Sequence, residues 1–241
     1  MKKKPRWKRI LLKLSGETLG GKGGFGLDVK AINYIANEIK KAYSLGVEIA
    51  VVIGGGNFIR GEKLSHWGID RATADYMGML GTIINALSLQ NILEKKFNLT
   101  TRVMTSFEIK AIAEPFILRR ALRHLEKGRI VIFAGGTGSP YFSTDTAASL
   151  RASEIEAQVI LKASKVKGVY EEDPEKNKNA KFLPSLSPLE MVKRGLKIMD
   201  LTAVTLALES KIPVVVFDVF KKGNLEKILL GEKIGTEINP T

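Results

Sequence analysis

The sequence contains no cysteine and only two histidines, and these absences exclude several kinds of chemistry. Without cysteine the chain forms no disulfide and offers no thiolate as a nucleophile or a metal ligand. His66 and His124 alone leave little for a zinc centre, so we interpret both as surface or packing residues and assign no metal ligands. A chain without cysteine fits a reducing compartment, and we expect a cytoplasmic protein.

Long apolar runs are also missing from the chain. No run approaches the roughly 18 residues needed to cross a bilayer, so we expect no membrane-spanning segment. The apolar stretch at residues 10–12 is shorter than the roughly 7 to 15 residues of a signal-peptide core, so we expect no export. With 241 residues, 44% of them apolar and 26% charged, the chain is long enough to bury one sizeable core.

Positive charge is concentrated near the N-terminus. The formal net charge is +13, and seven basic residues without an acidic one fall within residues 1–13. The other residues carry 31 basic and 25 acidic side chains, a surplus of +6 that suits phosphate handling and does not indicate nucleic acid as the main partner. We expect a basic arm over residues 1–8 and a single domain over residues 9–241.

Short apolar segments alternate with helical patterns along the whole chain. Six segments have the length and character of strands: residues 9–14, 47–53, 100–104, 129–133, 158–162 and 213–219. Most are almost continuously apolar, which indicates strands covered on both faces. Asp28 and Asn224 are predicted N-caps, and residues 187–190 have the form of a capping box. The pattern predicts an α/β fold, a three-layer αβα sandwich with a central, mainly parallel sheet.

Glycine-rich or polar junctions follow the first two predicted strands, and in a parallel sheet such junctions meet at the carboxyl edge, where ligands bind. The first, Lys13-Leu14-Ser15-Gly16-Glu17, offers a polyphosphate a cation and backbone N–H groups, although an ordinary turn has the same composition. The second, Gly54-Gly55-Gly56-Asn57, lets a ligand approach the main chain closely, and the nearby Arg60 suits a phosphate.

Two more junctions follow later strands. Residues 135–145 are rich in glycine and hydroxyls, and Thr144 or Asp145 can cap the helix that follows, whose N-terminus would attract an anion. Residues 162–170 again place lysines and a hydroxyl after a strand, and Tyr170 could cover an aromatic base. Together the four junctions favour phosphoryl transfer by positioning and charge compensation.

Two matches to familiar motifs lack a feature that their chemistry requires, and a third motif is absent. Residues 16–22 have the spacing of a Walker loop, but Gly23 replaces the hydroxyl residue that would hold magnesium. Residues 21–26 match G-x-G-x-x-G, yet six residues separate them from the strand end at Leu14, so they make no tight strand-to-helix turn. No G-x-S-x-G elbow is present, which argues against nucleophilic catalysis by serine.

The polar segments closely resemble those of the bacterial uridylate kinases, which have the amino acid kinase fold. The similar segments are Lys13-Leu14-Ser15-Gly16-Glu17, Gly54-Gly55-Gly56-Asn57, Arg60-Gly61, Asp75 with Met77-Gly78-Met79, Gly136-Thr137-Gly138, Thr144-Asp145, Lys162-Ala163-Ser164-Lys165-Val166, Asp173-Pro174 and Met199-Asp200-Leu201. The similarity runs in order from about residue 9 to the C-terminus. It implies transfer of the γ-phosphoryl of ATP, bound as MgATP, to UMP, giving UDP in de novo pyrimidine (CTP) biosynthesis.

The resemblance also implies roles for individual residues. The implied ATP contacts are Lys13, Leu14, Ser15, Gly16, Gly56, Arg60, Ser164, Tyr170 and Asp173. The implied UMP contacts are Gly55, Asp75 on the ribose hydroxyls, Thr137, Gly138, Ser139, Pro140, Tyr141, Phe142, Ser143 and Thr144. The implied catalytic residues are Lys13, Asp145 and a second cation, Lys162 or Lys165, with Asp145 organising the lysines around the transferred phosphoryl.

Regulation and assembly are implied in the same way. The family is typically a cytoplasmic homohexamer, activated by GTP and inhibited by UTP, and the implied GTP stretch is Gly21, Lys22, Gly23, Gly24, Phe25 and Gly26. Lys167 stands where the family usually has aspartate, which changes the charge near the ATP contacts. Two alternatives stay open: a kinase of the same fold acting on an acyl carboxylate, which would not need Asp75, and a nucleotide sensor or nucleic-acid binder with a degenerate kinase fold.

Overall fold

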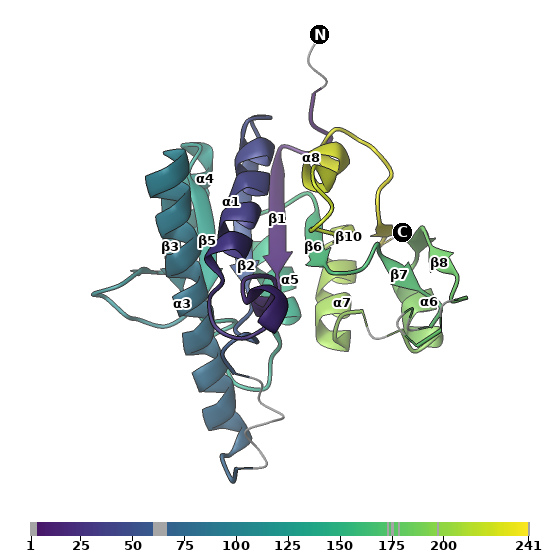
Figure 1. Cartoon of the computed structure of the whole chain (residues 1–241), viewed down its shortest axis with the longest axis horizontal. Coiled ribbons are helices and arrows are strands. Elements are labelled where there is room, and N and C mark those ends of the chain that lie inside the picture. The colour runs from purple at the N-terminus through teal and green to yellow at the C-terminus, as the bar shows by residue number, and fades with distance from the viewer. Residues whose placement is uncertain are drawn as a thin grey trace.

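The structure, a computed structural model, describes residues 4–59, 67–172, 174, 176–177, 179–196 and 198–240, without the side chain of Lys22. Within these residues the chain forms a nine-stranded sheet. Figure 1 shows helices on both faces of the sheet. The predicted three-layer α/β sandwich is confirmed. The sheet is mainly parallel, because helices carry the chain back to the same edge between most of its longer strands.

The strands lie side by side in the order β4-β3-β5-β2-β1-β6-β10-β11-β9. Their bounds are β1 (Arg9–Leu14), β2 (Glu48–Ile53), β3 (Thr101–Thr105), β4 (Glu114–Pro115), β5 (Ile130–Ala134), β6 (Ile160–Ser164), β9 (Ser185–Leu186), β10 (Val214–Asp218) and β11 (Thr236–Ile238). Only the β10–β11 pairing among them is antiparallel. A separate antiparallel hairpin pairs β7 (Val169–Tyr170) with β8 (Phe182–Leu183).

All six predicted strands are present, the first with the predicted bounds and the others with ends shifted by at most two residues. The other strands were not predicted, because two or three residues are too few to show a periodic pattern. The helices are α1 (Val29–Tyr43), α3 (Arg71–Phe97), α4 (Leu118–Glu126), α5 (Thr144–Glu154), α6 (Pro188–Lys193), α7 (Leu201–Glu209) and α8 (Asn224–Leu229), with 3-10 turns at Gly16–Thr18 and Gly21–Gly23. None of the described helices combines the length and hydropathy of a bilayer-spanning segment.

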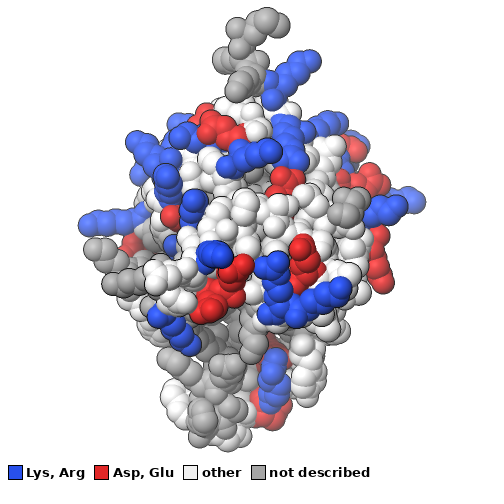
Figure 2. Space-filling view, turned by 90° about the vertical axis from the view of Figure 1, so that its right-hand side faces the viewer, with Lys and Arg blue, Asp and Glu red and all other residues white. Residues whose placement is uncertain are grey.

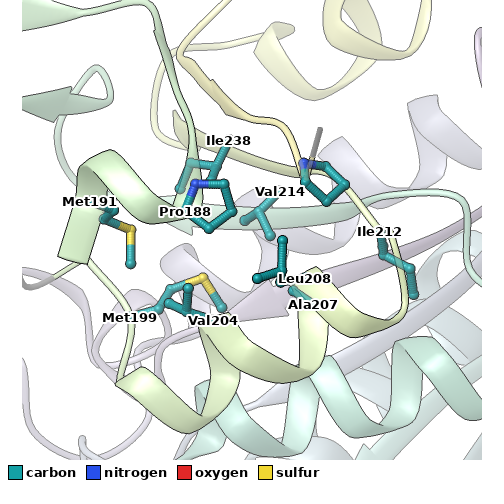
Figure 3. A pocket seen from close by; sticks show the side chains of 10 residues that line it. Pro188, Met191, Met199, Val204, Ala207, Leu208, Ile212, Val214 and Ile238 are labelled. Atoms are coloured by element: carbon teal, nitrogen blue, oxygen red, sulfur yellow. The ribbon is translucent and has the colours of Figure 1, made fainter. Parts of the chain in front are cut away.

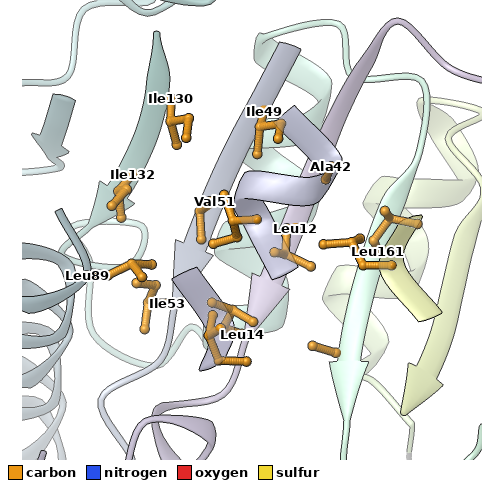
Figure 4. Packing of buried hydrophobic residues seen from close by; sticks show 14 of the residues in the cluster. Leu12, Leu14, Ala42, Ile49, Val51, Ile53, Leu89, Ile130, Ile132 and Leu161 are labelled. Atoms are coloured by element: carbon orange, nitrogen blue, oxygen red, sulfur yellow. The ribbon is translucent and has the colours of Figure 1, made fainter. Parts of the chain in front are cut away.

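The core lies on both faces of the sheet, because successive side chains of a strand point to opposite sides. In β1, Ile10, Leu12 and Leu14 pack toward α1, α3 and α8, whereas Leu11 packs toward the face covered by α5 and α7. Figure 4 shows the first of these clusters, with Leu12 and Leu14 facing side chains from neighbouring strands and helices. Each fully buried leucine contributes roughly 1.5–3 kcal/mol relative to an exposed one.

Helix caps confirm two of the predicted starts and correct a third. The Asp28 side chain accepts a hydrogen bond from Ala31 N, and Ser187 with Glu190 forms the predicted capping box. Asn224 is not a cap: Gly223, with a φ of 81°, takes that position. The Asn224 amide instead donates to the carbonyl of Asp218 over 2.9 Å, which fastens α8 to the end of β10.

Two residues of the predicted N-terminal arm are attached to the domain. Trp7 is buried, and Arg6 donates from its backbone N–H to the carbonyl of Leu229 over 2.7 Å. The Arg6 guanidinium also pairs with Glu237. This part of the predicted arm therefore belongs to the folded domain, because burying the Trp7 indole removes a large apolar surface from water. Figure 2 shows basic and acidic side chains interspersed on the face of the molecule at the right of Figure 1.

Candidate active site

The polar junctions meet at one edge of the sheet because β5, β2, β1 and β6 are adjacent and parallel. Lys13 of β1 lies beside Lys162 of β6 and Val52 of β2 in the strand register. Both lysines are near the carboxyl ends of their strands, so their side chains reach the same space above the sheet edge. The structure thus brings together groups that are about 150 residues apart in the sequence.

Two lysines and one aspartate form an ion cluster at this edge. Lys13 Nζ lies 2.7 Å from Asp145 Oδ1, and Lys162 Nζ lies 2.6 Å from both Asp145 oxygens. The three side chains are only 11% to 15% exposed. Lys165, the alternative second cation, is half exposed and pairs with Glu17 over 3.3 Å, so Lys162 is the lysine of the cluster.

Burial and charge perturb the titration of this cluster. Burial and the neighbouring Lys13 ammonium lower the pKa of Lys162 to about 8, against the opposing attraction of Asp145. Burial alone would raise the pKa of Asp145, but the ammonium groups of Lys13 and Lys162 outweigh it and hold that pKa below its ordinary value. Asp145 is therefore ionised at neutral pH, and two positive charges share one negative charge.

The N-terminus of α5 fixes the position of Asp145. Ser143 is the N-cap, because its Oγ accepts hydrogen bonds from the backbone N–H groups of Asp145 and Thr146. The prediction that Thr144 or Asp145 caps this helix is wrong, since both lie within it. The Ser143 hydroxyl donates to Asp200, whose other oxygen accepts from Thr146 Oγ1 over 2.8 Å. Asp200 also caps α7, so one carboxylate joins the starts of two helices.

The first two glycine junctions are in direct contact. Gly54 N donates to the carbonyl of Leu14 over 2.9 Å. A side-chain carbon at Gly16 would lie 2.7 Å from both Gly54 O and Gly56 N, so only glycine allows this approach. Gly55 packs equally tightly against the backbone of Gly78 in α3, whereas a carbon at Gly56 would meet nothing within 4 Å. Gly56 therefore faces open space.

The third junction folds back over α3. Tyr141 N donates to Asp75 Oδ2 over 2.7 Å, and Arg71 Nε lies 3.0 and 2.9 Å from the two Asp75 oxygens. Tyr141 has a φ of 71°, a conformation that side chains other than glycine adopt at some cost. Tyr141 and Phe142 are largely exposed, so their rings stand at the rim of the site.

A cavity of about 250 Å³, the α3 cavity, lies between this junction and α3. Its lining includes the predicted UMP contacts Gly55, Asp75, Phe142, Ser143 and Thr144, together with Gly56 and Arg71. The lining thus combines a carboxylate at one end with glycine backbone and a helix N-terminus at the other. Such an arrangement can hold hydroxyl groups and an anion of one molecule at the same time.

A second cavity of about 500 Å³, the α7 cavity, has Asp145 in its lining. Its walls are largely apolar and come from α6, α7 and the segment between them, with Met191, Leu196, Ile198 and Met199 among them. A small apolar gap of about 10 Å³ lies behind this wall, and Figure 3 shows Met191, Met199 and Val204 at its border. The gap has room for about one water molecule and no larger ligand.

The profile of the amino acid kinase family matches residues 8–218 of the chain. The chain belongs to the amino acid kinase family. Among solved structures it is similar to a UMP kinase from Bacillus anthracis, with 44% identity, a TM-score of 0.94, and coverage of 97% of this chain and 96% of that one. A UMP kinase from Ureaplasma parvum is 35% identical with a TM-score of 0.91, covering 97% and 99% of the two chains.

A uridylate kinase from Archaeoglobus fulgidus is a more distant relative, 27% identical over 95% of this chain and 99% of that one, with a TM-score of 0.70. The predicted resemblance is therefore confirmed at the level of the family and of its fold. Within the amino acid kinase family the chain groups with the UMP kinases, since its two more similar solved relatives are UMP kinases along almost their whole length.

Some residues predicted for this amino acid kinase lie away from both cavities. Ser164 ends β6 and accepts a hydrogen bond from Val166 N, and Tyr170 packs edge-on against Phe182 with ring centres 5.5 Å apart. Gly21–Gly26 lies beside Asn57 rather than at the ion cluster, with Gly26 N donating to the carbonyl of Asn57. The predicted residues Arg60 and Asp173, and the side chain of Lys22, lie outside the described part of the chain.

The histidines of this amino acid kinase take no part in the site as far as the structure describes them. His124 Nε2 lies 3.2 Å from Glu114, and its Nδ1 lies 3.0 Å from the Arg129 guanidinium, which is a packing role. His66 lies outside the described residues. Over the described ranges no group of three or more histidine, aspartate or glutamate side chains forms a metal site.

Sequence reasoning missed several residues that build the site of this amino acid kinase. The capping role of Asp200 was detectable, because an aspartate before a helical pattern is an N-cap signal. Arg71 was detectable as well, since it precedes Asp75 by four residues on one helix and such pairs interact. The apolar wall of the α7 cavity gives no local signal, because Met191 and Leu196 look like ordinary core residues.

Proposed function

We propose that this chain transfers the γ-phosphoryl of MgATP to UMP, giving UDP and ADP. The observation that carries the proposal is the buried cluster of Lys13, Lys162 and Asp145 at the sheet edge, with Asp145 in the lining of the α7 cavity and the adjacent Ser143 and Thr144 in the lining of the α3 cavity. A donor and an acceptor bound in these cavities would meet at the ion cluster. The likeness to two UMP kinases over 97% of the chain supports the choice of acceptor.

The α3 cavity suits UMP because its polar groups match the two ends of a nucleoside monophosphate. Asp75 can accept hydrogen bonds from the ribose hydroxyls, in place of those it now receives from Arg71 and Tyr141. The backbone around Gly55 and Gly56, with the N-terminus of α5, offers N–H groups to the phosphate. Phe142 also lines the cavity, and we assign the run Thr137–Phe142 to the uracil.

The α7 cavity suits the nucleoside of ATP. Its apolar wall can cover a purine, and it opens beside Asp145 at the ion cluster. The triphosphate would then extend toward Lys13 and the Ser15-Gly16 turn, as predicted from the first junction. Ser164, Tyr170 and Asp173 remain proposed ATP contacts, and Ser164 and Tyr170 would have to reach the nucleotide from the neighbouring β6–β7 segment.

The reaction requires little covalent participation by the protein. An oxygen of the UMP phosphate attacks the γ-phosphorus of ATP, the bond from that phosphorus to the β,γ-bridging oxygen breaks, and ADP leaves with the bonding electrons. The second pKa of a phosphate monoester is ~6, so the attacking oxygen is ionised at neutral pH and needs no general base. Lys13 and Lys162 would stabilise the charge on the transferred phosphoryl and the leaving oxygen.

Magnesium enters this proposal with ATP. Both Asp145 oxygens are held by lysine ammonium groups, so this carboxylate is a support for cations of the protein rather than a metal ligand. The metal would therefore be held by the phosphate oxygens of ATP. When bound there, Mg²⁺ neutralises phosphate charge and polarises the transferred group.

A substrate screen tests the function. The protein is incubated with MgATP and, separately, UMP, CMP, acetylglutamate, aspartate and carbamate, and the products are separated by chromatography. We expect UDP from UMP as the main product. Phosphorylation of an acid without any of UMP would support a carboxylate kinase of the same fold. Tight binding of UTP or DNA without UDP formation would support a sensor or nucleic-acid binder.

Regulation and assembly belong to the same proposal. We infer a cytoplasmic homohexamer, activated by GTP through Gly21–Gly26 and inhibited by UTP, which shares the uridine of the acceptor. Self-association is supported by Tyr76, Leu80 and Ile84, which are spaced by four residues on α3 and are about half exposed. Light scattering gives the mass of the assembly, and UDP formation with added GTP or UTP tests each effector.

A further inference from the structure

Two asparagines, Asn57 and Asn85, form a buried pair beneath the glycine turn that follows β2. The residues are only 1% and 0% exposed. Asn57 Nδ2 donates to Asn85 Oδ1 over 2.9 Å, and Asn85 Nδ2 donates to Asn57 Oδ1 over 2.7 Å. Each amide therefore satisfies the acceptor of the other and keeps one N–H for another partner.

The second N–H of each amide holds a loop. Asn85 Nδ2 donates to the carbonyl of Gly54 over 2.8 Å, and Asn57 Nδ2 donates to the carbonyl of Gly26 over 2.6 Å. Gly26 N donates in return to the backbone carbonyl of Asn57 over 2.8 Å. Through the pair, the long helix α3 is tied to the glycine turn and to the loop at residues 21–26.

The pair also touches the junction after β1. A side-chain carbon at Gly16 would clash with Asn57 Oδ1 as well as with the backbone of Gly54 and Gly56. Asn57 thus lies against the turn proposed for ATP, while Asn85 holds the turn proposed for UMP. Neither side chain lines the α3 cavity or the α7 cavity, so each would act through the backbone that it holds.

The chemistry of the pair requires amides at both positions. An aspartate at either position replaces an N–H donor by an oxygen, which would face a backbone carbonyl and the oxygen of the partner amide in a buried site. An apolar side chain would leave the carbonyl of Gly54 or Gly26 without its partner. A buried polar network of this kind stabilises one arrangement of its parts only when every member is satisfied.

We propose that Asn57 and Asn85 are positioning residues for phosphoryl transfer. The pair holds the Gly54–Gly56 turn against the Ser15-Gly16 turn and so sets the distance between the acceptor and donor phosphates. The inference rests on the proposed function, because it takes these two turns as the phosphate sites. Misplacement of reacting groups by about 1 Å can lower a rate on the order of a hundredfold.

The test compares Asn85→Asp and Asn57→Asp with Asn224→Asp in the full-length protein. Asn224 is the matched control: it is also buried and also donates to a backbone carbonyl, but it lies on α8 away from both turns. We expect each pair variant to lower kcat at least about tenfold while the KM for UMP and for ATP changes less than about threefold. In the control, Asn224→Asp, the melting temperature should fall by a similar amount as in the pair variants, and kcat should stay unchanged.

Rates are expressed per folded molecule, from denaturation curves measured in the same buffer, so that partial unfolding does not imitate a catalytic loss. Hydrogen exchange of residues 20–28 is measured in parallel and should be faster in Asn57→Asp than in Asn224→Asp. An unchanged kcat in the pair variants, with or without faster exchange, would overturn the inference. An inactive wild-type protein would instead refute the proposed function, so the two failures are distinguishable.

Discussion

The lowered pKa of Lys162 predicts how catalysis responds to pH. In the free protein Lys162 loses its proton as the pH rises through about 8, because burial and the Lys13 ammonium disfavour its charged form. If this charge stabilises the transferred phosphoryl, kcat/KM should fall about tenfold for each pH unit above that value. Bound ATP adds negative charge and raises the pKa of Lys162, so kcat should begin to fall at a higher pH than kcat/KM.

The stability of the protein should respond in the opposite direction. Below pH 8 Lys162 carries its proton in both the folded and the unfolded chain. Between the folded value of about 8 and the ordinary value of 10.5, only the unfolded chain holds the proton. The contribution of this group to stability therefore rises with pH across that window, by about 3 kcal/mol in total. Deprotonation of Lys162 therefore does not unfold the protein in this range, and a loss of activity there would have a cause other than such unfolding.

The assay measures UDP by chromatography from about pH 6 to about pH 10, which avoids coupling enzymes with pH profiles of their own. The Lys162→Arg variant should lose the fall above pH 8, even at a lower absolute rate, because guanidinium stays charged. Lys165→Arg, an exposed lysine paired with Glu17, is the control and should keep the wild-type profile. A flat kcat/KM profile to pH 10, or a fall that persists in Lys162→Arg, would refute the reasoning.

Four substitutions test other parts of the site. Lys13→Ala should lower kcat on the order of a hundredfold or more with little change in UMP affinity, because its ammonium meets the polyphosphate. Asp75→Ala should raise the KM for UMP roughly tenfold to a few hundredfold and leave that for ATP nearly unchanged. Gly55→Ala should destabilise the protein by about 1–3 kcal/mol, since its new carbon would clash with Gly78, whereas Gly56→Ala should fold normally.

Steady-state kinetics and chemical denaturation check these outcomes. An unchanged kcat in Lys13→Ala would contradict its role at the phosphates. A selective effect of Asp75→Ala on ATP would show that the α3 cavity holds the other nucleotide. Equal stability of Gly55→Ala and Gly56→Ala would mean that the tight approach of the glycine turn to α3 does not constrain the fold.

The sequence by itself determined the sheet and most of the chemistry offered at its edge. Continuous apolar strands such as residues 130–134 and 214–218 have no stable alternative to burial between two helical layers. The three consecutive glycines at Gly54–Gly56 likewise indicate, from the sequence alone, that another group approaches the main chain closely. Lys13 was found because it stands at a strand end that local patterns identify, whereas the role of Asp145 came from the family resemblance.

Only the tertiary structure decided which groups act together. The selection of Lys162 over Lys165 depends on the register of β6 against β1, which sets Lys162 beside Lys13, whereas Lys165 lies beyond the end of β6 and pairs with Glu17. Ser143, and not Thr144, is the N-cap of α5, and its hydroxyl is held by Asp200, about 57 residues away in the sequence. The Asn57–Asn85 pair and the wall of the α7 cavity arise from contacts between distant segments, and local sequence carries no record of such contacts.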